Sequence, residues 1–243
     1  MIVRENGVFF TLIRQNDHAL LSGEMASHWG NKTFAKPSNK LVLTTSLHDL
    51  SWIDSDASLH WNESRNTPYD FTNLPFVRRL PMYKKGLDFT EKLHPYGGLL
   101  TSLHYSSFLK EGEDLNADRF LHVEKTRQEK LRDNFFEDPI ENDLQQLQMF
   151  DRLSLYVCLN EPGTPKEKEH HWYKNGIQTT DKEGNPVTIS LRWLNERTVT
   201  LNPFPFSESW STTLSYSMVR KSLGSNDPDF NKVYNQHIRF VPT

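Results

Sequence analysis

The chain has 243 residues, of which 36% are hydrophobic, 12% aromatic and 24% charged, and its formal net charge is −3. This length suits one large domain or a domain with an appendage, and the weak negative charge argues against a nucleic-acid or anionic-membrane partner. No apolar run is long enough for a signal peptide or a bilayer span, and the single cysteine, Cys158, excludes an intramolecular disulfide. We therefore expect a globular cytoplasmic protein.

The N-terminal part of the chain favours helices after an ambiguous start. Residues 8–13 are β-branched and aromatic, which suits either a short strand or the lead-in to a helix. Asn16-Asp17 then offers an N-cap, apolar residues follow at helical spacing, and Gly30 provides a stop. This pattern predicts a helix over residues 17–29.

Four more helices are predicted by apolar spacing or by amphipathic charge patterns. They are expected over residues 41–49, 97–109, 115–134 and 142–159. Residues 54–81, in contrast, are rich in Asp, Ser, Asn, Thr and Pro, which predicts an ordered loop with room for one short helix. A loop of this length usually covers another part of the protein.

After Pro162 the pattern changes to short alternating segments separated by turn residues, which is typical of antiparallel strands. These segments are residues 187–193, 197–201 and 213–219, with 238–241 as a fourth candidate. We therefore predict a mainly α protein, with a helical domain over residues 1–160 and a β-rich C-terminal extension over residues 161–243 packed on it.

The adjacent pair His48-Asp49 is the first candidate for a metal site. Neighbouring residues on a helix point about 100° apart, so both reach one ion only if it lies between their two directions. His18 begins the first predicted helix, and Asp151 lies among apolar residues late in the last one, which favours burial and a partner. Imidazole nitrogen and carboxylate oxygen together suit first-row divalent metals better than calcium.

Other roles stay open for each of these residues. His48-Asp49 also suits a buried hydrogen-bonded pair, His18 a histidine in a capping turn, and Asp151 a salt-bridged helix residue.

The order of a histidine, a His-Asp pair and a distant aspartate resembles the HD-domain superfamily of metal-dependent phosphohydrolases. The resemblance covers roughly residues 14–158 as sparse points. More narrowly, residues 15–23, 28–30 and 151–155 are similar to an uncharacterised bacterial family of unknown function that we associate with this superfamily. The resemblance implies an HD-domain-like helical bundle in which one divalent transition metal, Mn, Fe, Zn, Co or Ni, is bound by His18, His48, Asp49 and Asp151.

Superfamily members that hold two ions add histidines between the His-Asp pair and the last aspartate. This chain has His60, His94, His104 and His122 in that interval. His104 is the best candidate, because it lies in an apolar predicted helix where an unpartnered imidazole is costly to bury. It also suits a core histidine bonded to a carbonyl, so the resemblance leaves one or two ions open.

The resemblance implies hydrolysis of a small phosphorylated molecule. A divalent ion lowers the pKa of a bound water to about 7 in favourable sites, which supplies a nucleophile near neutral pH. We predict Asp49, Arg14 and Arg152 as catalytic residues, since the two arginines are the closest in sequence to the ligands and can clamp a phosphate. Arg78-Arg79 and Lys84-Lys85 can also face an anion, although such pairs are usually solvated.

Two further functions stay open. One is a di-iron oxygenase on the same helical scaffold, which relatives of that type suggest, and the other is a catalytically silent sensor or ligand-binding protein. No phosphate-binding glycine loop and no Gly-x-Ser-x-Gly elbow occurs. Cys158 lies in an apolar run, where burial makes it a poor nucleophile. The sequence leaves the oligomeric state open.

Overall fold

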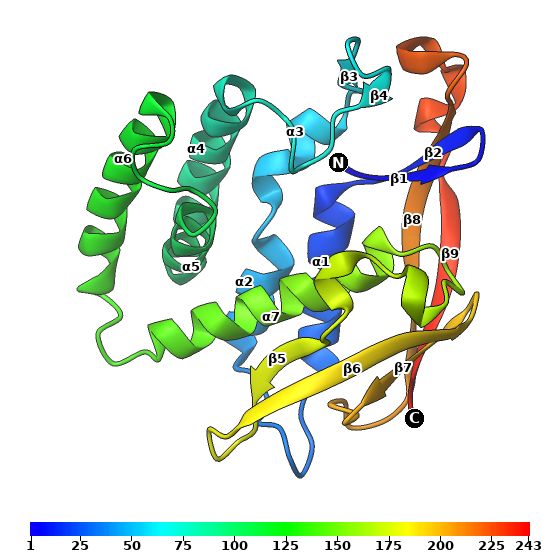
Figure 1. Ribbon diagram of the computed structural model, residues 1–243. Helices are drawn as coiled ribbons and strands as arrows, with labels where there is room; N and C mark the ends of the chain where they lie inside the picture. Colours follow the sequence, from blue (N-terminus) through cyan, green and yellow to red (C-terminus); the bar gives the residue numbers. More distant parts are fainter.

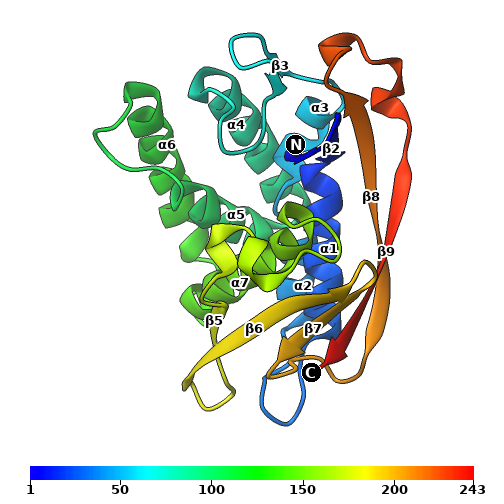
Figure 2. The same cartoon turned by 45° about the vertical axis from the view of Figure 1, so that its right-hand side comes forward.

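A curled sheet of seven strands wraps around one side of two helices, α1 (Gln15–His28) and α7 (Ile140–Leu159), in the computed structural model, which describes residues 1–243 (Figure 1). The remaining helices lie mainly on the far side of α1 and α7 from the sheet (Figure 2). They are α2 (Asn39–Leu47), α3 (Ile53–Asp56), α4 (Phe76–Leu93), α5 (Pro95–Ser106) and α6 (Leu115–Arg132).

The sheet joins the two ends of the chain. Its strands are β1 (Ile2–Asn6), β2 (Phe9–Ile13), β5 (Ile177–Thr180), β6 (Pro186–Asn195), β7 (Thr198–Asn202), β8 (Trp210–Arg220) and β9 (Tyr234–Pro242). They are ordered β1-β2-β8-β9-β7-β6-β5, with every neighbouring pair antiparallel except β7 and β9. A separate two-stranded ribbon is formed by β3 (Trp61–Asn62) and β4 (Thr67–Pro68).

The largest hydrophobic core lies between the concave face of this sheet and helices α1 and α7. It includes Met25 of α1, Phe150 and Tyr156 of α7, and Leu201 and Phe240 of the sheet. Burying this much aromatic and aliphatic surface fixes both helices against the sheet. This packing fixes the positions of both helices, which carry residues of the site described below.

The prediction of a mainly α, HD-domain-like bundle with a β appendage was wrong. The protein is a mixed α/β fold, because β1 pairs with β2, and β2 pairs with β8, so that the N-terminal strands make one sheet with the C-terminal strands. Residues 10–13 of β2 are all buried, so they lack the polar and apolar alternation that identifies a half-buried strand. Strands from both sides of residue 160 share the sheet, and a domain division at that residue stays a prediction.

The prediction of a loop over residues 54–81 placed the end of the loop too late in the chain. This range includes short α3 but also the first turns of α4, which contains Pro81 in its interior. Proline within a helical pattern normally ends or kinks a helix, and this hid α4 from the sequence pattern. Lys84 and Lys85 therefore lie on a helix, and each pairs with an aspartate at the surface.

The strand β5 was also missed, because only four residues carry its pattern. None of the helices combines the length and the apolar character that a membrane crossing requires.

Candidate metal centre

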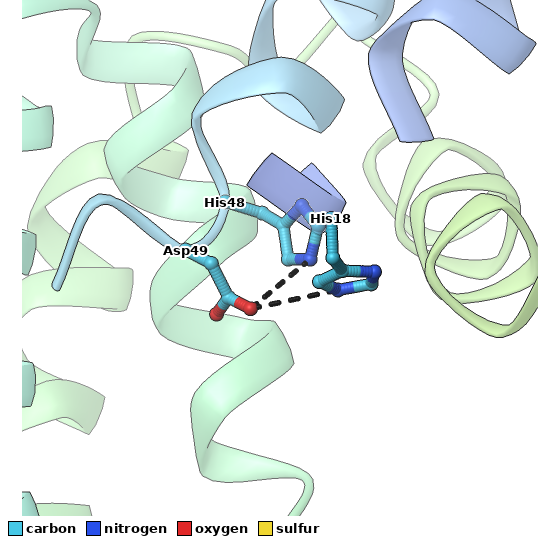
Figure 3. A group of neighbouring side chains, drawn as sticks. All are labelled: His18, His48 and Asp49. Atoms are coloured by element: carbon cyan, nitrogen blue, oxygen red, sulfur yellow. Dashed lines mark ion pairs between the residues drawn. The ribbon is translucent and has the colours of Figure 1, made fainter. Parts of the chain in front are cut away.

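Three helices bring two histidines and two aspartates together in the interior. His18 comes from the first turns of α1, His48 and Asp49 follow the last residue of α2, and Asp151 lies in the middle of α7. Figure 3 shows the side chains of His18, His48 and Asp49 pointing toward one another. Both histidines are 1% exposed, so this polar cluster is built inside the protein.

Small residues allow the helices to approach closely enough to form the cluster. A Cβ atom at Gly23 of α1 would lie 1.8 Å from Oγ of Ser46 on α2, so only glycine permits this contact. On the other side of α1, the hydroxyls of Ser22 and Ser154 lie 2.6 Å apart across the contact with α7. These contacts set the distances between His18 and the ligands on the neighbouring helices.

His48 and Asp49 lie at the end of a helix, and this differs from the predicted helix over residues 41–49. Helix α2 ends at Leu47, with His48 as its C-cap, and Asp49 has φ −110° and ψ 24°. The turn therefore does not hold the two side chains at the fixed angle of consecutive helical residues. Both reach the same point next to His18.

The imidazole Nε2 atoms face carboxylate oxygens. Nε2 of His18 lies 3.1 Å from Oδ1 of Asp151 and 3.6 Å from Oδ2 of Asp49. Nε2 of His48 lies 3.7 Å from each of the same two oxygens. Neither Nε2 atom has a hydrogen-bond partner, although both are buried.

The opposite nitrogen of each ring fixes the tautomer. Nδ1 of His48 lies 2.7 Å from the Thr45 carbonyl oxygen, which can only accept, so Nδ1 carries a proton. Nδ1 of His18 lies 2.6 Å from Oγ of Ser154, which in turn contacts Ser22. Ser154 donates to the carbonyl oxygen of Asp151 at 3.0 Å, so its oxygen accepts the proton of His18 Nδ1.

With Nδ1 protonated, a neutral imidazole turns the lone pair of Nε2 toward the carboxylates. Lone pairs and carboxylate oxygens repel one another in a buried site unless a cation lies between them. That cation is a proton or a metal ion. A histidine that binds a metal usually donates the N–H of its other ring nitrogen to a nearby acceptor, which leaves Nε2 free for the ion.

The charged groups of the cluster shift one another's pKa values. Burial by itself lowers the pKa of His48, but the Asp49 and Asp151 carboxylates outweigh it and raise this pKa to about 9. For Asp151, burial by itself raises the pKa, but the neighbouring His18 and His48 outweigh this effect and hold the pKa well below its usual range. Burial raises the pKa of Asp49. Without metal, a proton on His48 therefore supplies the balancing positive charge at neutral pH.

The donor set fits a divalent transition metal. For metal–ligand bonds of about 2.0–2.2 Å, neighbouring donor atoms lie roughly 3–3.5 Å apart, close to the separations observed here. His18, His48 and Asp49 form one group of mutually adjacent ligand atoms, and His48, His104 and Asp151 form a second. The buried cluster can hold a metal ion.

His104, on α5, lies at the edge of the cluster. Its Nε2 atom is 3.6 Å from Oδ2 of Asp151, the carboxylate oxygen that does not face the other histidines. Burial lowers the pKa of His104 to about 3, so its ring is neutral and available as a donor. His104 is therefore a further potential metal ligand beside Asp151. His60, His94 and His122 belong to neither group of potential ligands.

Two residues that hold Asp49 were missed by the sequence analysis. Tyr105 donates to Oδ1 of Asp49 at 3.0 Å, and the Gln15 side-chain amide donates to Oδ2 at 3.1 Å. Tyr105 directly follows His104, and Gln15 begins α1. An adjacent aromatic and a polar residue at a helix start are too common for this role to be recognised from sequence.

A cavity of about 540 Å³ opens onto the cluster. Asp49, His104 and Asp151 lie in its wall, and so does Arg152, as a phosphate-binding residue requires. Arg14, in contrast, is exposed and does not line this cavity, so the structure does not bring it to the cluster.

Two segments outside the ligand-bearing helices complete the cavity. Phe71 and Thr72 come from the long loop before α4, and Arg79 from α4 itself. The segment between α7 and β6 contributes Trp172, Tyr173 and residues 176–178. The C-terminal part of the chain therefore covers the site whose ligands the helices supply.

Residues 1–221 match the family described as "Protein of unknown function (DUF3891)". The chain belongs to this family. No curated protein matches it, and no solved structure does.

Membership of DUF3891 corrects the predicted assignment to the HD-domain superfamily, which was wrong. The resemblance rested on the order of four polar residues, and such sparse points do not define a family. The cluster that those four residues form is a property of this DUF3891 chain and is argued from its own geometry.

Proposed function

We propose that the protein is a metal-dependent hydrolase of phosphoesters. The observation that carries the proposal is the pair of buried, unpartnered Nε2 atoms of His18 and His48, which face two carboxylates beside a cavity. Such a site supplies metal ligands and an adjoining space for a substrate. A buried pair with only a structural role normally satisfies its polar atoms.

Each residue has a distinct role in this proposal. His18, His48, Asp49 and Asp151 hold the ion, while Ser154 and the Thr45 carbonyl keep Nε2 free on both histidines. When bound, a divalent ion polarises a phosphoryl oxygen and makes an attached water nucleophilic near neutral pH. Arg152 lies in the cavity wall, where its guanidinium neutralises charge on the phosphate.

The test is metal-dependent turnover of generic phosphoesters. The purified protein is stripped with a chelator, reloaded separately with Mn, Fe, Zn, Co or Ni, and assayed with aryl phosphomonoesters and diesters. We expect activity to disappear on chelation, to return with at least one metal, and to be absent from His48→Ala. His122→Ala is the matched control, because His122 is an exposed histidine on α6. Full metal retention by both His48→Ala and Asp49→Ala contradicts the proposal.

A second candidate, an iron-dependent oxygenase, is favoured by the second group of potential ligands. His48, His104 and Asp151 lie close enough to hold an ion of their own, and the two oxygens of Asp151 face different histidines. Oxygen consumption by the iron-loaded protein, without phosphoester turnover, distinguishes this candidate from hydrolysis. Its most sensitive variant is His104→Ala.

A further inference from the structure

Two guanidinium groups reach the cavity without a carboxylate partner. Arg152 is on α7, next to Asp151, and Arg79 is on α4. No Asp or Glu oxygen lies within ion-pair distance of either, although the chain has arginines that do form ion pairs, namely Arg4, Arg127 and Arg132. Arginine presents a fixed fork of donors that matches phosphate and carboxylate. An anion bound in the cavity would give each group the charged partner that it lacks.

The orientation of Arg79 is already fixed. Its Nη1 atom donates to the carbonyl oxygen of Phe71 at 2.9 Å, and its guanidinium lies 4.5 Å from the ring centre of Phe76. Its Nε atom is buried and has no hydrogen-bond partner. A buried donor without a partner is costly, and a held side chain loses little entropy on binding. The remaining donors of Arg79 are therefore prepared for a ligand.

Aromatic side chains form the apolar part of the same cavity. Phe108, after the end of α5, is 54% exposed, and Trp172, in the segment after α7, is 46% exposed. Phe71 packs edge-on against Trp172, with ring centres 6.3 Å apart. Large apolar side chains left open in a cavity are typical of ligand-binding surfaces. A flat organic group packs against such rings better than a small or fully charged one.

We infer that the substrate is a phosphoester whose organic part is flat and apolar. Arg79 and Arg152 bind its phosphate, and Phe108 and Trp172 contact its organic part. The inference rests on the proposed function for the identity of the anion, but the binding itself requires no turnover. Arg79 is then a specificity residue that lies more than 60 positions along the chain from the metal ligand His18 and more than 70 from Asp151.

Binding of two matched phosphonates tests the inference. Phenylphosphonate and methylphosphonate carry the same anionic group, and only the first has a flat apolar body; neither contains an ester to hydrolyse. Calorimetric titrations are made with metal-loaded and with metal-free protein. We expect phenylphosphonate to bind at least about tenfold more tightly than methylphosphonate, since burying a ring adds apolar contact. Equal affinities overturn the aromatic part of the inference.

Variants locate the binding residues. Arg79→Gln and Arg152→Gln should each weaken both phosphonates about 10- to 100-fold, as for loss of a hydrogen bond to a charged group. Trp172→Ala should weaken phenylphosphonate and leave methylphosphonate unchanged. Arg78→Gln is the matched control, because Arg78 is the exposed neighbour of Arg79 and does not line the cavity.

The two arginine variants keep the test valid if one of them disturbs folding. Arg79 also holds the Phe71 loop, whereas the exposed Arg152 side chain makes no hydrogen bond of its own. Unchanged phosphonate affinity in both variants, in protein that hydrolyses phosphoesters, overturns this inference alone. Arginine-dependent phosphonate binding in protein without metal or turnover overturns the proposed function and leaves the anion site in place.

Discussion

Two charged clusters in the helical half of the molecule are built in opposite ways. In the first, Arg127 of α6 donates to three carboxylates, those of Asp88, Glu91 and Glu124. In the second, the metal-site cluster, His18 and His48 face two carboxylates without a hydrogen bond between them. The first cluster is half-buried, with the Asp88 side chain 39% exposed, whereas the second is buried and opens onto a cavity.

The two clusters differ in how their negative charges are balanced. Arg127 lies between α4 and α6, and its Nε atom donates to Glu124 at 2.8 Å, while Ser102 of α5 donates to the same oxygen. One oxygen of Glu124 is unpartnered. Lys84 and Lys130 add ion pairs to Asp88 and Glu91, so the three carboxylates of this cluster face three cations. The Arg127 cluster therefore holds three helices together. In the metal-site cluster the positive charge is a proton on His48, which a bound metal ion would replace.

Removing a ligand from the metal-site cluster should have the largest effect. Asp151→Ala deletes the carboxylate that both histidines face, and we expect its metal affinity to fall by more than about 100-fold, beyond the usual effect of losing an outer partner. Metal content after dialysis and competition with a chromophoric chelator measure the loss. If Asp151→Ala binds metal as tightly as the wild type, the metal-site cluster does not differ from the Arg127 cluster in the way described.

Removing the centre of the Arg127 cluster should instead affect stability. Arg127→Met leaves the fully buried Glu124 without its cation, and we expect the free energy of unfolding to fall by about 3–5 kcal/mol. The metal content per folded chain should not change. Urea unfolding in the presence of a chelator measures the first quantity. As a control, Arg132→Met removes an exposed ion pair with Glu141 and should cost less than about 1 kcal/mol.

A smaller effect is expected from the group that orients His18. Ser154→Ala removes the acceptor for Nδ1–H but keeps all four ligands, so metal affinity should fall by about 10- to 100-fold without being lost. Ser27→Ala, on the exposed face of α1, is the control. Chelator competition on both variants gives the ratio. Equal affinity of Ser154→Ala and the wild type would show that Ser154 has only a packing role.

Proton release gives the smallest and most graded effect. Because the pKa of His48 is raised to about 9, metal-free protein is protonated there at pH 7 and must lose that proton when metal binds. Apparent metal affinity should therefore rise about tenfold per pH unit between pH 7 and 9. Calorimetry in two buffers of different ionisation enthalpy counts the protons released. Metal binding without proton release contradicts the raised pKa of His48.

The same pKa gives an opposite trend for stability. A raised pKa in the folded state means that the contribution of His48 is fully present below about pH 6.5 and is lost as pH rises through about 9. Metal-free protein should therefore become less stable across this range while its metal affinity increases. Urea unfolding at pH 6, 7.5 and 9 with chelator checks the direction.

The grouping of the four side chains was expected from a resemblance in the order of a histidine, a His-Asp pair and a distant aspartate, and only for Asp151 did the surrounding residues favour burial as well. Asp151 is flanked by apolar residues of α7, and this context alone indicates burial. The partners of the ligands could not be predicted. Ser154 and His18 lie 136 positions apart, and nothing in either neighbourhood indicates that their side chains meet.

The sheet and the cavity show where local patterns fail. Strand β2 is buried on both faces, so its residues do not alternate, and its pairing with β8 joins segments about 200 positions apart. Arg78 and Arg79 are equivalent in sequence, and only the helical phase of α4 turns Arg79 toward the cavity. Pro81 concealed that helix, so the more important arginine of the pair could not be identified.

The central claim is that one ion binds between His18, His48, Asp49 and Asp151. The most direct measurement is an anomalous-difference map from a crystal of protein loaded with a transition metal, recorded on both sides of the absorption edge. We expect a peak between Nε2 of the two histidines and the two carboxylates. Loaded crystals with no peak there, or with metal only at surface histidines such as His170 and His171, would contradict it.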